Sequence, residues 1–233
     1  IPPSDISEML LELDPYQRAA LLRTLDVKRQ VEIITELDLR KQKDLIEDLD
    51  TRTVVELFDR MPADEATDLL QTLSTRDAAR IVTELPTRKA REIANLMRHE
   101  TDSAGGLMTT EYVVLSPDMT VGDTIERIRS FAGRVETTQT SYVLDAERKL
   151  IGAVRMSSLL LESNHIRIEE IMEQKPPAIE VNSSVKDIAF LFDKYNLFVA
   201  PVVNDQGVLE GIITIDDVLS RVVDETWGER SAL

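Results

Sequence analysis

The acidic side chains near the end of the chain are the residues best suited to chemistry. The stretch IDDVLSRVVDETWGER, residues 215–230, has the periodicity of an amphipathic helix. Its apolar stripe consists of Leu219, Val222, Val223 and Trp227. Its opposite face carries Asp216, Asp217, Arg221, Asp224, Glu225 and either Gly228 or Glu229. Carboxylate oxygens are the ligands that divalent cations such as Mg²⁺ take in proteins, but acids on exposed helix faces are often only solvated. The residues alone leave two interpretations open, a cation site and an ordinary solvent-exposed helix face.

A second acidic feature lies in the first half of the chain, in PADEATDLL. Asp64 and Asp68 are four residues apart, which puts both on one face of a helix, and no Lys or Arg lies on that turn. Like charges at this spacing destabilise a helix unless something compensates them. Solvation is the commoner compensation, and a bound cation is the alternative.

Composition narrows the classes of function. The formal net charge of the 233 residues is −16, which argues against a nucleic-acid partner and favours cations. The chain has no cysteine and so no thiolate ligand, and we expect a reducing, cytosolic compartment. Its two histidines stand alone, and it has no Gly-rich phosphate loop, so we expect no enzyme. No window is apolar enough to span a bilayer, and the first residue, Ile1, indicates an excised or processed fragment.

The positions of these acidic side chains are set by the secondary structure around them, and in the first half of the chain that structure is a repeat. Residues 10–93 divide without a gap into seven copies of twelve residues. In each copy positions 1, 4 and 12 are apolar, and position 5 is Asp, Ser or Pro, the residue types that cap or begin a helix. A helix this short buries only a narrow stripe, so consecutive copies must stack to share a core. The pattern therefore predicts an α-helical superhelix of right-handed type over residues 1–104.

From Met108 onward the pattern changes to short β-branched runs that alternate with helical segments. VVLSPDMTVGDTIERI corresponds to AIEVNSSVKDIAFLF, and SYVLDAERKLIGAVRMSSLL corresponds to APVVNDQGVLEGIITIDDVL. Matching positions are Met108 with Met172, Val121 with Val185, and Gly152 with Gly211. We therefore predict two copies of one β/α module. Gly105 and Gly106 precede the first copy, and we expect them to end the last helix of the array and to form the joint.

The endings of the two modules, GAVRMSSLL and GIITIDDVL, resemble those of the tandem cystathionine-β-synthase (CBS) domain pair. Pairs of this family usually dimerise and often sense adenine nucleotides. The resemblance implies that Thr214 and Asp217 contact the ribose and phosphate of a nucleotide, with ATP as a candidate ligand. The first module has Arg155 and Ser158 at the matching positions, so one of the two nucleotide half-sites is altered.

A helical array joined through DSAGGLMT to a CBS pair resembles, over the whole chain, the cytosolic region of the MgtE family of magnesium transporters. The resemblance implies a fold of class α plus α/β. It divides the chain into a helical N domain at residues 1–104, a first CBS domain at 105–171, and a second at 172–233 that ends in the start of a connecting helix. It also implies a homodimer formed through the CBS pairs, attached to a transmembrane domain at the cytoplasmic face of the cell membrane.

For function, the resemblance implies a sensor in which Mg²⁺ binds between acidic faces of the N domain and the CBS pair and favours the closed state of an ion pore. The implied metal ligands are Asp64, Asp68, Asp217, Glu225 and Glu229, with Asp224 beside them. Asn196 stands where the family has a carboxylate, and Asp193 is the candidate for a substitute oxygen. The alternative function is a CBS-type adenine-nucleotide sensor fused to a helical scaffold for protein interaction.

Overall fold

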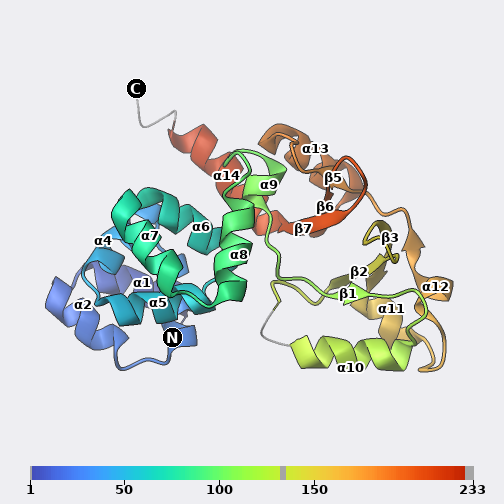
Figure 1. The fold of residues 1–233 in the computed structure, drawn as a ribbon, viewed down its shortest axis with the longest axis horizontal. Helices are drawn as coiled ribbons and strands as arrows, with labels where there is room; N and C mark the ends of the chain where they lie inside the picture. The colour runs from blue at the N-terminus through green and yellow to red at the C-terminus, as the bar shows by residue number, and fades with distance from the viewer. Residues whose placement is uncertain (1, 132–134, 229–233) are drawn as a thin grey trace. The chain divides into compact units, whose positions relative to one another are not determined.

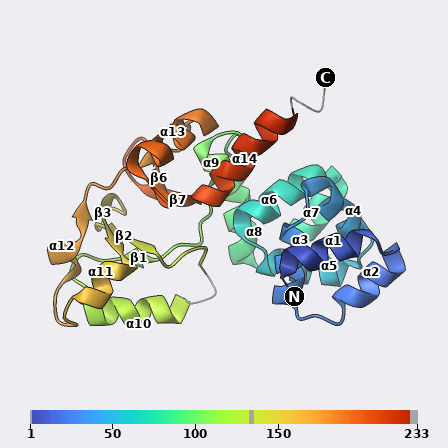
Figure 2. The same cartoon turned by 180° about the vertical axis from the view of Figure 1, so that it is seen from behind.

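The computed structural model describes residues 2–131 and 135–228, with their side chains described up to residue 222 (Figures 1 and 2). The chain divides into two compact units, Ile1–Met97 and Arg98–Leu233. The domain boundaries expected at residues 104 and 171 remain predictions.

The first unit is an array of short helices, and its described residues form eight of them (Figure 1). Their bounds are α1 Pro3–Leu11, α2 Pro15–Leu22, α3 Val27–Thr35, α4 Leu39–Glu47, α5 Thr51–Arg60, α6 Ala63–Thr72, α7 Thr75–Glu84 and α8 Thr87–Leu96. Helices two apart in the chain pack together, as α1 does with α3 and α6 with α8. The prediction of a helical array built from twelve-residue repeats is confirmed.

The fifth position of each repeat is the residue at which a helix begins. These N-caps are Asp14, Asp26, Asp38, Asp50, Pro62, Ser74 and Pro86. The Asp and Ser side chains accept a hydrogen bond from a backbone N–H in the first turn, as Asp26 does from Arg29 at 3.0 Å. The two prolines provide no such bond, so their helices begin without a side-chain cap.

The core of the first unit follows the apolar positions of the repeat. Position 12 of consecutive copies supplies Ile33, Leu45, Leu57 and Leu69, and position 1 supplies Ile34, Ile46, Phe58 and Leu70, all of them buried. Adjacent positions 12 and 1 lie at the end of each helix and face the same continuous core. Stacking therefore buries the narrow stripe that one short helix could not bury alone.

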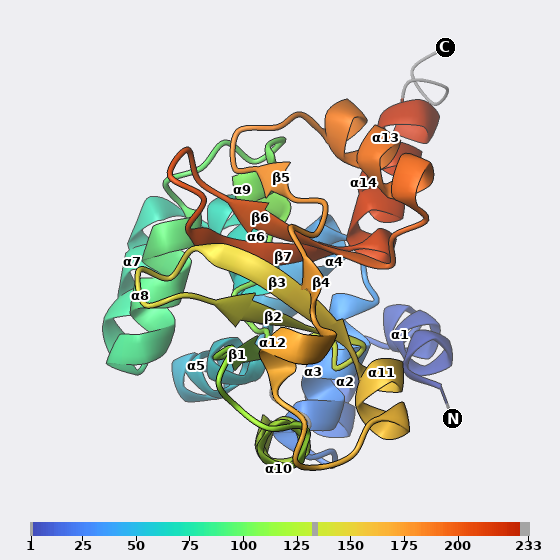
Figure 3. The same ribbon diagram turned by 90° about the vertical axis from the view of Figure 1, so that its right-hand side faces the viewer.

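The second unit contains two small sheets with helices around them (Figure 3). The first sheet has the order β1-β2-β3-β4, made of Val114–Leu115, Thr140–Leu144, Leu150–Arg155 and Glu173–Gln174. The second has the order β5-β6-β7, made of Ile179–Glu180, Val199–Val203 and Leu209–Thr214. The helices are α9 Ala104–Leu107, α10 Val121–Phe131, α11 Met156–Leu161, α12 Ile168–Ile171, α13 Val185–Tyr195 and α14 Ile215–Gly228. In both sheets the first two strands are parallel and the next pair is antiparallel, as the predicted module repeat requires.

The two modules exchange the segments that precede them. The segment at Met172 leads into β4, which pairs with β3 of the first module, whereas Thr109 pairs with Ile212 in β7 of the second. A Cβ atom on Gly152 would lie 2.5 Å from the sulfur of Met172, and one on Gly211 would lie 2.7 Å from that of Met108. Each glycine is therefore needed to admit the methionine of the other module.

The prediction for Gly105 and Gly106 is wrong in one respect. The last helix of the array, α8, ends at Leu96, and both glycines lie inside the short helix α9. The N–H of Gly105 donates to Val181 O at 2.8 Å, and that of Ala104 donates to Ser183 O at 2.9 Å. These bonds join α9 directly to the second CBS module. The glycines are explained by the segment before α9, because a Cβ atom on Gly105 would lie 2.5 Å from the His99 side chain and one on Gly106 would lie 2.3 Å from the carbonyl oxygen of Glu100.

Candidate functional site

The acids of α6 lie on a partly buried face of the first unit. Asp64, Glu65 and Asp68 are all half-buried, and one carboxylate oxygen of Asp64 is buried. Asp64 and Glu65 fall in the first turn of α6, where the positive end of the helix dipole stabilises negative charge. The dipole therefore offsets part of the repulsion within this group of acids, and the face remains strongly negative.

Thr214 and Asp217 form a helix cap at the start of α14. The hydroxyl of Thr214 donates to the Asp217 carboxylate, and the backbone N–H of Thr214 donates to the same oxygen at 3.3 Å. Thr120 and Asp123 make the same pair at α10. In the first module, Arg155 precedes α11 without a side-chain cap. The Thr-x-x-Asp pattern thus has a structural role that is independent of any ligand.

An acidic cluster surrounds Glu136. Burial, and then the negative charges of Asp217, Asp216 and Glu111, raise the pKa of Glu136 to about 7. The backbone N–H of Glu136 donates to Glu111 O at 2.8 Å, which places the two residues side by side. We call Glu111, Glu136, Asp216 and Asp217 the acidic cluster. Such mutual repulsion is typical of carboxylates gathered for a cation or for proton transfer.

Sequence reasoning missed Glu111 and Glu136. Neither residue belongs to a helical face or to a motif, since both lie in the irregular segments between α9 and β2. One signal was available. Between the matched positions the first module is five residues longer than the second, since Val121 to Gly152 spans 31 positions and Val185 to Gly211 spans 26, and Glu136 lies in the longer stretch.

The predicted substitute ligand Asp193 is exposed near the end of α13. Asn196 ends this helix in the left-handed conformation, with φ 49° and ψ 51°. Asparagine tolerates this conformation better than most residues, which accounts for Asn196 at a position where a carboxylate was expected.

Three further predicted ligands fall at the edge of the described structure. Asp224 and Glu225 belong to α14, but their side chains lie outside the described residues, as does the whole of Glu229. Their assignment as metal ligands remains a prediction.

A cavity of about 400 Å³ is lined by residues of both CBS modules. The first module contributes Thr140, Arg155 and Ser157 to its lining, and the second contributes Asn196 and Phe198. Arg155 forms an ion pair with Glu173 at 3.8 Å, and both side chains are largely exposed. This volume is within the range of small-molecule sites, and among the described residues that line the cavity the one charged side chain is the cationic Arg155.

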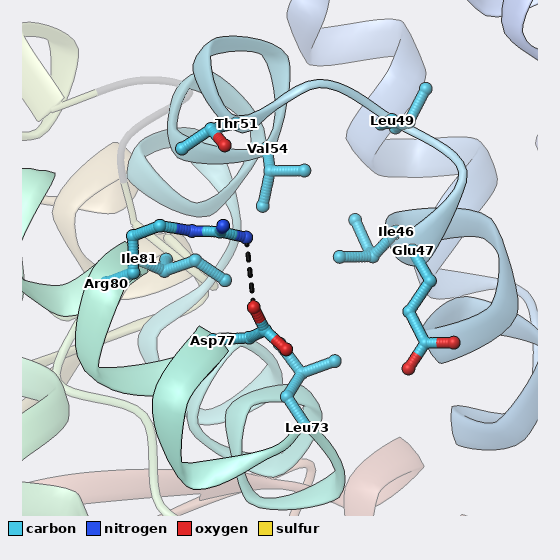
Figure 4. A pocket seen from close by; sticks show the side chains of 9 residues that line it. All are labelled: Ile46, Glu47, Leu49, Thr51, Val54, Leu73, Asp77, Arg80 and Ile81. Carbon is cyan, nitrogen blue, oxygen red and sulfur yellow. Dashed lines mark ion pairs between the residues drawn. The ribbon is translucent and has the colours of Figure 1, made fainter.

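A smaller cavity of about 150 Å³ lies among α4, α5 and α7 of the first unit (Figure 4). Ile46, Val54 and Ile81 line it with apolar surface, and Asp77 and Arg80 form an ion pair at 3.1 Å beside it. The pair satisfies its own charges, and the space is below the usual size of a ligand pocket. This cavity has no features of an active site.

The carboxylates suit Mg²⁺ chemically. Within residues 2–131 and 135–222, no three His, Cys, Asp or Glu side chains are arranged to hold a metal ion. Mg²⁺, however, commonly binds through only one or two protein carboxylates and keeps several waters. One carboxylate oxygen of Asp64 is buried, and the acidic cluster brings negative charge to Glu136.

Comparison with known proteins bears on both units. Residues 1–102 match the family described as the MgtE intracellular N domain, and residues 104–165 and 168–224 match the CBS domain family. The magnesium transporter MgtE of Thermus thermophilus is 38% identical over 128 residues, which are 55% of this chain and 28% of that protein. The magnesium transporter MgtE of Bacillus subtilis is 30% identical over 130 residues, which are 56% of this chain and 29% of that protein. The chain therefore spans less than a third of the length of these two relatives.

A solved structure is similar over nearly the whole chain. The crystal structure of the cytosolic domain of the Mg²⁺ channel MgtE in complex with ATP has a TM-score of 0.90, with 30% identity, and covers 94% of this chain and 90% of its own. In the part of the chain that the structure describes, no helix is long and apolar enough to cross a membrane.

Proposed function

Because the chain belongs to the MgtE family of magnesium transporters, with the N domain and the CBS pair of that family, we propose that it is a regulatory region that senses cytosolic Mg²⁺ and gates a transporter. The matched families are not enzyme families, and we propose no catalytic role. The proposal assigns Mg²⁺ to the acids of both units, where its binding favours the closed state of the pore.

The observation that carries this proposal is the acidic cluster around Glu136. Burial, together with the negative charges of Asp217, Asp216 and Glu111, raises the pKa of Glu136 to about 7, so this carboxyl group is only partly ionised at neutral pH. Repulsion among ionised carboxylates lowers the free energy of unfolding. A bound divalent cation would offset this repulsion and restore the stability. Asp217, whose charge contributes to the raised pKa of Glu136, is also a residue that the family resemblance assigns to Mg²⁺.

In the proposed mechanism Asp64 and Asp68 hold Mg²⁺ on the first unit and Asp217 holds it on the second. Asp193, Asp224, Glu225 and Glu229 are the further candidate ligands. Mg²⁺ supplies positive charge between surfaces that otherwise repel each other. Each ion stabilises the bound state by its own mass-action term, about 1.4 kcal/mol at ten times its Kd. Loss of the ions at low Mg²⁺ then returns the equilibrium to the open state.

The experiment is a Mg²⁺ titration followed by thermal stability, protease resistance and solution scattering. We expect millimolar Mg²⁺ to raise the melting temperature and compact the particle, and NaCl at equal ionic strength to do much less. The test variant combines Asp217→Asn with Glu225→Gln, because Asn keeps a hydrogen-bonding group at the helix cap. The control combines Asp205→Asn with Glu162→Gln, which removes the same charge from exposed sites. A wild-type protein indifferent to Mg²⁺, or equal midpoints for the two variants, contradicts the proposal.

A second candidate function is adenine-nucleotide binding in the 400 Å³ cavity. Arg155 offers the planar guanidinium that phosphate prefers, and the exposed ring of Phe198 offers a surface on which a base can stack. We assign the nucleotide to this cavity and not to Thr214 and Asp217, because the acidic cluster repels phosphate. ATP in the similar solved structure supports this candidate.

Calorimetric titration with ATP tests the nucleotide assignment. We expect Arg155→Ala to weaken binding by about tenfold or more, since a charge-assisted bond is lost. Arg167→Ala, an exposed arginine on the same module, serves as the control. Absence of ATP binding, or equal losses in the two variants, rejects the assignment.

We also propose that two copies associate through their CBS pairs and that the assembly lies at the cytoplasmic face of the membrane, joined to a transmembrane partner. The second unit exposes large apolar side chains on its helices, among them Leu160, Leu161, Phe190 and Leu219. Such exposure is typical of protein interfaces. Analytical ultracentrifugation checks the dimer: Leu161→Lys with Phe190→Glu should yield a folded monomer, and a variant that remains dimeric argues against this surface.

A further inference from the structure

Lys89 is a charged side chain that the first unit buries almost completely, with 1% of its surface exposed. A lysine is rarely buried unless its ammonium is paired. Its position adds a second cost, because it lies in the first turn of α8, where the helix dipole repels cations. Neighbouring groups must therefore stabilise this positive charge.

Lys89 departs from the pattern of its own repeat. It occupies position 8, and the same position of the other six copies is exposed or half-buried: Gln17, Arg29, Lys41, Thr53, Glu65 and Asp77. The apolar stripe of the repeat does not require a buried side chain here. The burial of Lys89 is thus specific to this copy.

The hydrogen bond of Lys89 does not itself need a charge. Its Nζ donates to the backbone carbonyl of Met61, the C-cap of α5. In earlier copies neutral glutamines satisfy the corresponding carbonyl, Gln30 bonding to Leu25 O at 2.8 Å and Gln42 to Leu37 O at 2.7 Å. An amide therefore suffices for this structural task, and the charge of Lys89 calls for a separate explanation.

The explanation lies in the acids that follow Met61. Pro62 is the N-cap of α6, whose first turn carries Asp64 and Glu65, and α8 packs against α6. Asp64 is only three positions after Met61 in the chain, so the ammonium lies within roughly 10 Å of the acidic turn. At such a separation, in a partly buried setting, opposite charges attract appreciably.

We propose that Lys89 is a resident cation that sets the Mg²⁺ affinity of the acidic face of α6, made of Asp64, Glu65 and Asp68. This inference rests on the proposed function and names a residue that tunes it. The ammonium offsets part of the negative charge when Mg²⁺ is absent, which keeps the first unit folded. It also repels an arriving cation, so Mg²⁺ binds this face more weakly than the acids alone would dictate.

The test compares two neutralised lysines in the full chain. Lys89→Gln keeps a group that can bond to the Met61 carbonyl but removes the charge, and Lys28→Gln removes the same charge from an exposed site on α3. We expect Lys89→Gln to lower the Mg²⁺ midpoint of the thermal titration by about three- to tenfold, and Lys28→Gln to leave it within about 1.5-fold of wild type. Without Mg²⁺, Lys89→Gln should melt lower than Lys28→Gln, and saturating Mg²⁺ should narrow the gap.

An unchanged or higher midpoint for Lys89→Gln overturns the inference. A wild-type protein with no Mg²⁺ response instead overturns the proposed function, so the two failures are distinguishable. If Lys89→Gln is too unstable for the Mg²⁺ titration, the double variant Lys89→Gln with Asp64→Asn is measured instead. It lacks one positive and one negative charge. We then expect the double variant to regain stability, and a double variant no more stable than Lys89→Gln contradicts the role of Lys89 as the counter-ion of this face.

Discussion

The carboxyl group of Glu136 makes the stability of the chain depend on pH, and replacing it by glutamine tests the acidic cluster. Burial first, and then the charges of Asp217, Asp216 and Glu111, raise its pKa from 4.5 to about 7. The folded state therefore holds this proton more tightly than the unfolded state does. The carboxyl group does not lower stability below pH 4.5, and its ionisation lowers stability progressively as the pH rises from 4.5 through about 7.

The size of the effect on the free energy of unfolding follows from the same shift in the pKa of Glu136. A rise from 4.5 to about 7 corresponds to about 3 kcal/mol of unfolding free energy at about 1.4 kcal/mol per pH unit. Neighbouring atoms partly desolvate the carboxyl group, but Glu136 as a whole residue is exposed, so water and salt screen much of this interaction. We therefore expect Glu136→Gln to stabilise the protein by about 1 kcal/mol at pH 8, a gain of about 2–4 °C in melting temperature for a chain of this size.

Urea unfolding at pH 4.5 and pH 8, without divalent cations and at equal ionic strength, measures the effect. Glu136→Gln should match wild type at the lower pH and exceed it at the higher pH. Glu162→Gln, a neutralised exposed acid after α11, controls for the change in net charge. Two results would refute the idea that the acidic cluster disfavours ionisation of Glu136: a difference in stability between Glu136→Gln and wild type that is the same at both pH values, or equal gains for Glu136→Gln and Glu162→Gln.

Two further predictions concern packing and backbone conformation. Gly211→Ala places a methyl group 2.7 Å from the Met108 side chain and 2.8 Å from the carbonyl oxygen of Thr109, so we expect a loss of about 1–3 kcal/mol in urea unfolding. Gly122→Ala, whose added carbon meets nothing closer than 3.3 Å, is the control and should change little. Asn196→Val puts a β-branched residue at φ 49° and should lose about 1–2 kcal/mol. Asn196→Gly should keep wild-type stability, and equal melting temperatures for the two Asn196 variants would argue against the left-handed cap.

The helical array could be predicted from sequence because each repeat carries its own start signal. The polar cap and the apolar pair are local features, so Asp26 and Asp38 mark helix starts whatever the rest of the chain does. The exchange of segments between the CBS modules was visible only as the matching of Met108 with Met172 and of Gly152 with Gly211. Their contacts cross between modules, and no local pattern reports such a pairing.

The candidate site could be predicted only where acids lie on regular elements. Asp64, Asp68 and Asp217 follow helical spacing, whereas Glu111 and Glu136 come together through the fold of irregular segments. Lys89 was overlooked for a similar reason. Its burial follows from the packing of α8 on α6, and in the repeat it appears as one more polar residue at a variable position.

The segment around Met108 also constrains how the CBS pair folds. The contact of Met108 with Gly211 joins residues 103 positions apart, 211 minus 108, and such long-range closure is slow because loop entropy opposes it. The second module is not complete until a segment that precedes the first module docks on it. The two modules therefore form one cooperative folding unit, and deletion of residues 108–112 should damage the second module although these residues lie beside the first module in the sequence.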